Sequence, residues 1–176
     1  VEGSNSETRR RCSLDLLNAM CRRFEEKTTA ICAEHVTQML ADYATDPNSK
    51  WAMKDAAIHL MLGIAVRRQS FAFGVSEVST VVNVIDFFQS NILPELQDTN
   101  HASRPVVKAD ALKFVSVFRV QFTKEQLIQL IPVVTNHLSS PIVVVHTFAA
   151  YTIEQMLTAT ETYMGKTRKL NGTDLR

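Results

Sequence analysis

The side chains that could do chemistry are five histidines, three cysteines and several acids that lie close to lysines. Cys32 and His35 are three positions apart, so on a helix they would share one face. A structural zinc site needs four ligands, and the other histidines are scattered along the chain. The residue types therefore predict no metal site.

Motifs for catalysis are missing from the sequence. The five glycines form no phosphate-binding loop, and neither His-Glu-x-x-His nor Gly-x-Ser-x-Gly occurs. His146 follows a run of valines, which favours a hydrogen-bonded core histidine over a general base. The sequence thus predicts a protein that is not an enzyme and holds no cofactor.

Charged residues recur at comparable places in the chain. Asp55 and Asp110 lie close to Lys54 and Lys108 in two similar segments. We favour ion pairing between stacked helices as the interpretation of these residues. The Arg9–Arg11 run fits either a solvated helix face or a patch for an anionic partner.

Helices must position these residues, because a similar helical opening occurs at Trp51, Pro105 and Pro141, with a weaker copy near Glu7. A second apolar helix is expected between successive openings. Units of two helices that recur at roughly 40 residues are typical of HEAT and armadillo solenoids. We therefore expect an all-α superhelix of three helix pairs plus a seventh helix, with no sheet.

Apolar periodicity and capping signals set the expected bounds. Residues 69–76 are expected to form a loop, residues 1–160 a HEAT segment, and residues 161–176 a flexible tail or linker. Ser4 and Glu7, and Thr123 and Gln126, have the spacing of capping boxes, and Ser140-Pro141 that of an N-cap followed by a first-turn proline. The expected helices cover about 7–24, 28–44, 50–67, 78–96, 105–120, 123 onward, and 141–160, with Trp51, Phe88, Phe114 and Leu130 in a shared core.

Composition excludes several classes of protein. A hydrophobic fraction of 45% over 176 residues supports a full core, and a net charge of +1 gives no basis for binding nucleic acid or a membrane surface. No apolar run approaches the roughly 18 residues of a membrane helix. The three cysteines, with no Cys-x-x-Cys pair, are expected to be buried free thiols. A first residue Val1 suggests a piece of a longer protein.

Several motifs in the chain have a wording that helical periodicity does not account for. They are Trp51-x-x-Lys54-Asp55-Ala56-Ala57-Ile58, Val82-Asn83-Val84-x-Asp86-Phe87-Phe88, Asn91-Ile92-Leu93-Pro94-x-Leu96, Pro105-Val106-x-Lys108-Ala109-Asp110, Phe118-Arg119-x-Gln121 and Val143-Val144-Val145-His146-Thr147-x-Ala149-Ala150. With these motifs, about residues 1–157 resemble the middle of the CAS exportins, which belong to the karyopherin-β (importin/exportin) superfamily. The resemblance implies a non-enzymatic transport receptor that binds importin-α and Ran-GTP and shuttles between nucleus and cytoplasm. A HEAT scaffold of an unrelated complex, such as a phosphatase, is the alternative.

The same resemblance places the second helix of each pair on the concave, partner-facing side. Glu34, Asp86 and Glu125 would make that wall acidic and suited to basic partners; a merely solvated face is the alternative. A fragment with so few repeats is expected to bind either partner weakly by itself. The residues expected to contact partners are Glu34, Gln38, Asp86, Ser90, Gln97, Glu125 and Gln129.

Overall fold

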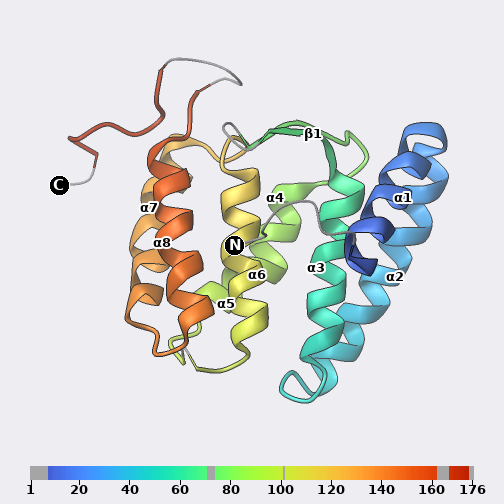
Figure 1. The fold of residues 1–176 in the computed structure, drawn as a ribbon, viewed down its shortest axis with the longest axis horizontal. Helices are drawn as coiled ribbons and strands as arrows, with labels where there is room; N and C mark the ends of the chain where they lie inside the picture. Colours follow the sequence, from blue (N-terminus) through green and yellow to red (C-terminus); the bar gives the residue numbers. More distant parts are fainter. Residues whose placement is uncertain (1–7, 71–73, 101, 162–166, 175–176) are drawn as a thin grey trace.

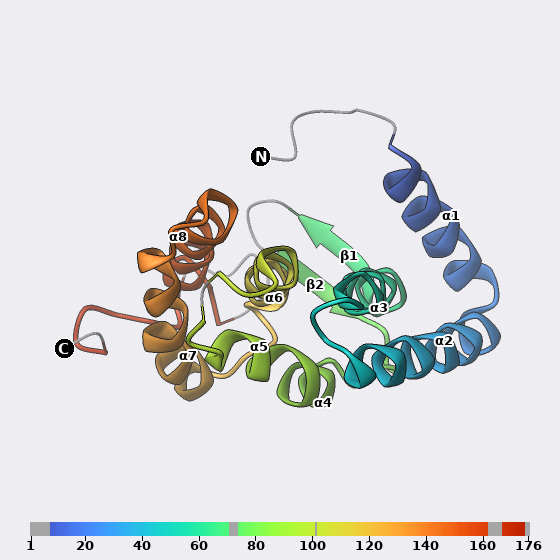
Figure 2. The same ribbon diagram turned by 90° about the horizontal axis from the view of Figure 1, so that it is seen from below.

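The helices of the chain stack as antiparallel pairs in two layers. The computed structural model describes residues 8–70, 74–100, 102–161 and 167–174. Helices α2, α4, α5 and α7 form one layer, and α3, α6 and α8 form the other, with α1 beside α2 at one end (Figures 1 and 2). This arrangement confirms the expected all-α stack of three pairs and a seventh helix. The main helices are α1 (Arg9–Arg23), α2 (Glu25–Thr45), α3 (Trp51–Ala65), α4 (Val84–Phe87), α5 (Leu93–Gln97), α6 (Pro105–Phe118), α7 (Lys124–Asn136) and α8 (Val143–Leu157).

The helix expected over 78–96 is shorter and is interrupted. It begins at α4, where the Asn83 side chain caps the first turn by accepting from the Asp86 N–H. A π-helical turn, η1 (Phe88–Ile92), then joins α4 to α5. The Leu93 N–H donates to the Phe88 carbonyl, one residue farther back than in an α-helix. Pro94 follows at once, and because proline has no N–H to donate, the wider turn fits a bend at this point.

A β-hairpin lies where a loop and no sheet were expected. Strands β1 (Val66–Ser70) and β2 (Gly74–Val78) pair antiparallel, and α3 ends at Ala65. The Gln121 side chain donates to the Val75 carbonyl at 3.2 Å, which fixes β2 against the end of α6. The expectation of a sheet-free chain is therefore wrong, because contacts with distant residues stabilise a hairpin that local alternation does not reveal.

The shared core contains three of the four expected residues. Phe88, Phe114 and Leu130 are buried, at 5%, 0% and 4% exposure. Phe88 packs against Phe122 in an edge-to-face arrangement with ring centroids 4.8 Å apart. Trp51 is 39% exposed, so its assignment to the core is wrong. It is the first residue of α3, where fewer neighbouring turns cover a side chain.

The helix caps agree with the sequence at one place and differ at another. Thr123 and Gln126 form the predicted capping box at the start of α7. Helix α8 begins at Val143 after Ile142 rather than at Ser140-Pro141. The Ser140 hydroxyl instead accepts from the Ile142 N–H at 3.2 Å, after the short 3-10 helix η2 (His137–Ser139). The expected Ser4–Glu7 capping box lies outside the described residues.

The last described segment contacts the preceding helices. Leu170 is 5% exposed, and the Lys169 ammonium donates to the carbonyls of Val120 and Phe122. The division of the chain at residue 160 stays a prediction. Cys21 and Cys32 are free and buried as expected, whereas Cys12 is exposed. Within the described ranges, no helix has both the length and the apolar character needed to span a membrane.

Candidate partner-binding surface

The seven residues expected to contact partners all lie on the exposed sides of helices in one layer, with η1 joining two of them. Figure 2 shows α2, α4, α5 and α7 following one another along the same side of the molecule. The seven side chains therefore form a row of solvent-exposed polar residues, and their contact with a partner stays a prediction. The row consists of Glu34 and Gln38 on α2, Asp86 on α4, Ser90 on η1, Gln97 on α5, and Glu125 and Gln129 on α7.

Two acids of this surface also stabilise helix starts. The Asn83 amide donates to the Asp86 carboxylate at 2.5 Å, within the first turn of α4. Glu125 lies in the first turn of α7, where hydrogen bonds from its own N–H and then from the Thr123 hydroxyl lower its pKa. An acid in a first helical turn gains from the positive end of the helix dipole. Asp86 and Glu125 thus have a structural role that the sequence pattern did not separate from binding.

A cleft opens on this layer between the C-terminal ends of α5 and α7. Its volume is about 260 Å³, and Gln97 is the surface residue that lines it. Backbone and side chains at the two helix ends supply both polar and apolar wall. The cleft can therefore receive a side chain of a bound protein. Its lining residues are Leu96, Gln97, Asp98, Thr99, Val133, Asn136 and Ser139.

Behind the surface, Glu95 joins three helix segments through a buried polar network. Its carboxylate accepts from Lys54 on α3 at 2.8 Å and from the Tyr43 hydroxyl on α2 at 2.5 Å. Arg104, just before α6, donates to its other oxygen at 3.2 Å. Burial alone would raise the pKa of Glu95, but the hydrogen bonds from Lys54 and Tyr43 outweigh it and hold the pKa below its usual range. The network fixes the relative positions of the layers.

The lysines pair differently from the expectation. Lys54 bonds to Glu95, and Lys108, which is fully buried, bonds to Asp98 at 3.0 Å. Neither of these pairs contains Asp55 or Asp110, the aspartates that were expected in ion pairs between stacked helices. The expectation of ion pairs between stacked helices holds, but with other partners.

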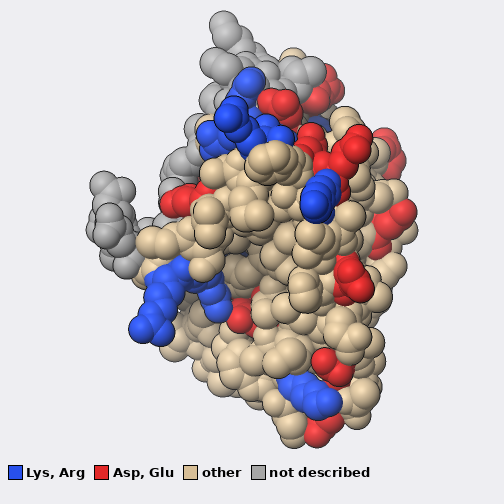
Figure 3. Space-filling model, turned by 90° about the vertical axis from the view of Figure 1, so that its right-hand side faces the viewer, with Lys and Arg blue, Asp and Glu red and all other residues tan. Residues whose placement is uncertain are grey.

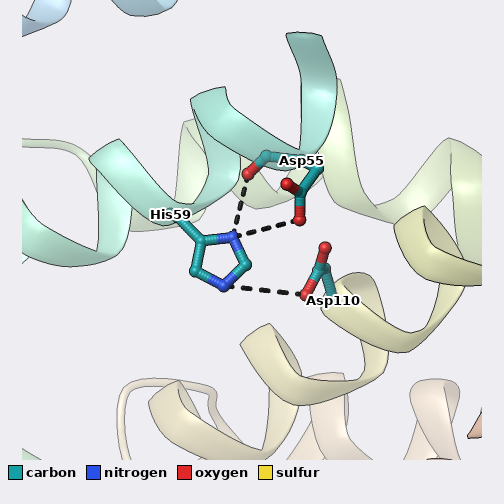
Figure 4. A group of neighbouring side chains, drawn as sticks. All are labelled: Asp55, His59 and Asp110. Carbon is teal, nitrogen blue, oxygen red and sulfur yellow. Dashed lines mark hydrogen bonds and ion pairs between the residues drawn. The ribbon is translucent and has the colours of Figure 1, made fainter. Parts of the chain in front are cut away.

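The aspartates belong to a second network, which joins α1, α3 and α6. Figure 4 shows its part between α3 and α6. Arg10 on α1 donates to the Asp55 carboxylate at 2.9 Å, and the Nε2 atom of His59 lies 3.8 Å from the Asp110 carboxylate. Burial, followed by the nearby Asp55 carboxylate, raises the pKa of Asp110 to about 8. Arg10 therefore pairs with the next repeat, while His59 was not singled out by the sequence because it lies in the apolar repeat motif.

One end of the stack is apolar. Leu16, Met20 and Phe24 expose 63%, 45% and 63% of their surface, and Ile31 exposes 49%. Figure 3 shows this side of the molecule, which is largely uncharged over its centre. Exposed apolar side chains grouped in this way are typical of surfaces that contact another protein segment.

The fold consists of stacked antiparallel helix pairs, with a hairpin between α3 and α4. Such a stack defines a helical-repeat protein. The family model of Cse1 matches residues 1–153. Exportin-2 of Oreochromis niloticus is 42% identical over 158 residues, and exportin-2 of Homo sapiens is 40% identical over the same length. The chain belongs to the Cse1 family.

A solved structure agrees with this assignment. The exportin Cse1 in its cargo-free, cytoplasmic state is similar with a TM-score of 0.83 and 36% sequence identity, over 89% of this chain. The chain spans only 17% of that protein and 16% of the exportin-2 relatives.

Proposed function

We propose that this chain is a segment of a nuclear export receptor that carries importin-α from the nucleus to the cytoplasm in complex with Ran-GTP. Its part is that of a non-catalytic scaffold. The observation that carries the proposal is the match to exportin Cse1 in both sequence and backbone, over nine-tenths of the chain. The receptor as a whole would shuttle between the two compartments.

The exposed row on α2, α4, η1, α5 and α7 is the proposed contact surface within the segment. Glu34, Gln38 and Gln129 lie within α2 and α7 beyond the first turn, and are exposed. A polar side chain there is available to a partner at little cost to the helix. The cleft beside Gln97 adds a concave feature to the same layer. Two acids of the exposed row, Asp86 and Glu125, would add negative charge for a basic partner.

The rigid networks behind the surface support a scaffold role. Glu95 connects α2, α3 and the start of α6, so the spacing of the helices that carry the surface is fixed. A surface assembled before binding loses less entropy when the partner docks. The apolar end around Leu16 and Phe24 fits a further helix pair of the same solenoid, which would continue the stack.

The test uses the complete protein from which this segment comes. It should retain importin-α on an affinity matrix when Ran is loaded with a non-hydrolysable GTP analogue, and should release importin-α when Ran carries GDP. The 176-residue chain alone should retain little of either partner. If the complete protein binds importin-α equally well with either nucleotide on Ran, the proposed export function is refuted.

A further inference from the structure

Three potential metal ligands converge between α3 and α6. Asp55 and His59 are one helical turn apart on α3, and Asp110 faces them from α6 (Figure 4). One ligand atom from each residue lies within 4.8 Å of the others. Imidazole nitrogen together with carboxylate oxygen is a ligand set that suits Zn²⁺.

The histidine ring is oriented with its metal-binding lone pair toward this point. Its Nδ1–H donates to the backbone carbonyl of Asp55 at 2.9 Å. That bond selects the tautomer whose Nε2 atom carries a lone pair, which accepts from Arg10, and a hydrogen-bonded second nitrogen is the usual support of a metal-binding histidine.

The two carboxylates hold oxygen atoms that the rest of the chain does not satisfy. Within the described residues, Asp55 Oδ1 and Asp110 Oδ2 have no hydrogen-bond donor. The two residues are 7% and 9% exposed, so solvent reaches them poorly. Buried carboxylate oxygens ordinarily have partners, and a cation is one partner that could satisfy both at once.

We propose that Asp55, His59 and Asp110 bind a zinc ion that links α3 to α6. Water would complete the coordination sphere, since three protein ligands leave a position open. The ion would join the first helices of successive pairs at the middle of the stack. This site is independent of the exposed surface on the other layer, so it neither requires nor tests the proposed export function.

One feature of the cluster must change on binding. Arg10 donates to Asp55 and to His59 Nε2, at 2.9 and 3.2 Å, so its guanidinium competes with the ion for these two ligands. Its side chain is 57% exposed and can turn toward solvent.

Isothermal titration of the 176-residue chain with Zn²⁺ measures the affinity. Asp110→Asn is the decisive variant, because its amide can donate to Asp55 and preserve the fold while offering a poorer ligand. Asp110→Asn and His59→Gln should each weaken binding by more than about tenfold, the loss typical for even an outer partner of a metal ligand. Arg10→Ala should strengthen binding, because it removes the competing cation.

His35→Ala is the matched control, since His35 is exposed and lies on α2 rather than on the helices that carry the cluster. It should not change the affinity, and circular dichroism should show that every variant is folded. The proposal is overturned if the parent chain does not bind Zn²⁺, or if the parent and the folded Asp110→Asn variant bind Zn²⁺ equally well. A proton shared between Asp55 and Asp110 would then account for the cluster.

Discussion

The buried pair of Lys54 and Glu95 provides the sharpest stability prediction. Glu95→Gln keeps the size of the side chain and removes its charge. Lys54 and Glu95 are each 5% exposed, and their charged atoms are 2.8 Å apart. Removing one member of a buried ion pair leaves the other charge uncompensated, at a cost of about 3–5 kcal/mol.

The structure favours the lower end of that range. A glutamine oxygen can still accept from Tyr43 or Lys54, and burial lowers the pKa of Lys54, so the lysine gives up its proton more easily than a free one. We therefore expect the free energy of unfolding to fall by about 3 kcal/mol. For a chain of this length each 1 kcal/mol moves the melting midpoint by roughly 2–4 °C, which gives a shift of about 6–12 °C.

Urea and thermal unfolding followed by circular dichroism measure this loss. The control is Glu77→Gln, which removes the same charge from the exposed pair of Arg68 and Glu77 on the hairpin. Exposed pairs contribute only about 0–1 kcal/mol, so the control should unfold almost as the parent does. The double variant Lys54→Met, Glu95→Gln should recover part of the lost stability. Equal losses for Glu95→Gln and Glu77→Gln would refute the reasoning.

Three further predictions concern stability. The fold lowers the pKa of Glu95, so the carboxylate contributes its full stabilisation above the unfolded-state pKa of about 4.3 and loses it as the pH falls through the folded-state pKa. The unfolding free energy of the parent should therefore fall more steeply on acid titration than that of Glu95→Gln. Phe114→Ala should lower the unfolding free energy by about 3–5 kcal/mol, because the ring is fully buried; an unchanged urea midpoint would contradict its place in the core. Gly74→Ala should lower the unfolding free energy by at least about 1–2 kcal/mol, because φ is +76° and the new Cβ would lie 2.9 Å from the Val117 carbonyl oxygen. A melting midpoint equal to that of the parent would show that the hairpin can shift to make room.

The regular part of the fold could be predicted from the sequence because it depends on local patterns. Apolar residues at helical spacing gave the helix pairs, and the Thr123 capping box gave the start of α7. The hairpin could not be predicted in this way, since Val66–Ser70 has no apolar alternation. It depends on distant partners: Arg67 and Ser79 both bond to Glu25 on α2, more than 40 positions away.

The candidate surface was only partly predictable, for a similar reason. Helical spacing identifies which residues share an exposed face, and all seven expected residues are exposed. It does not identify which acids serve helix starts, as Asp86 does through its bond with Asn83. Nor can it pair Lys54 with Glu95 across 41 positions, because that contact exists only after the helices stack.

Because Asp86 and Glu125 also stabilise helix starts, reversing their charge would lower stability by about 0.3–1 kcal/mol each and confuse a binding test. The better surface variant is therefore Glu34→Lys, Gln38→Lys and Gln129→Lys, whose sites lie beyond the first turns of α2 and α7. Its matched control adds positive charge elsewhere, with Glu154→Lys on the exposed side of α8 in the other layer.

Assembly of the complete receptor with importin-α and Ran-GTP, measured for these variants by surface plasmon resonance, tests the account most directly. The account predicts that the triple variant on α2 and α7 weakens assembly while its melting midpoint stays near that of the parent, and that Glu154→Lys leaves assembly intact. Unchanged assembly by the triple variant would contradict the assignment of this surface to the export complex.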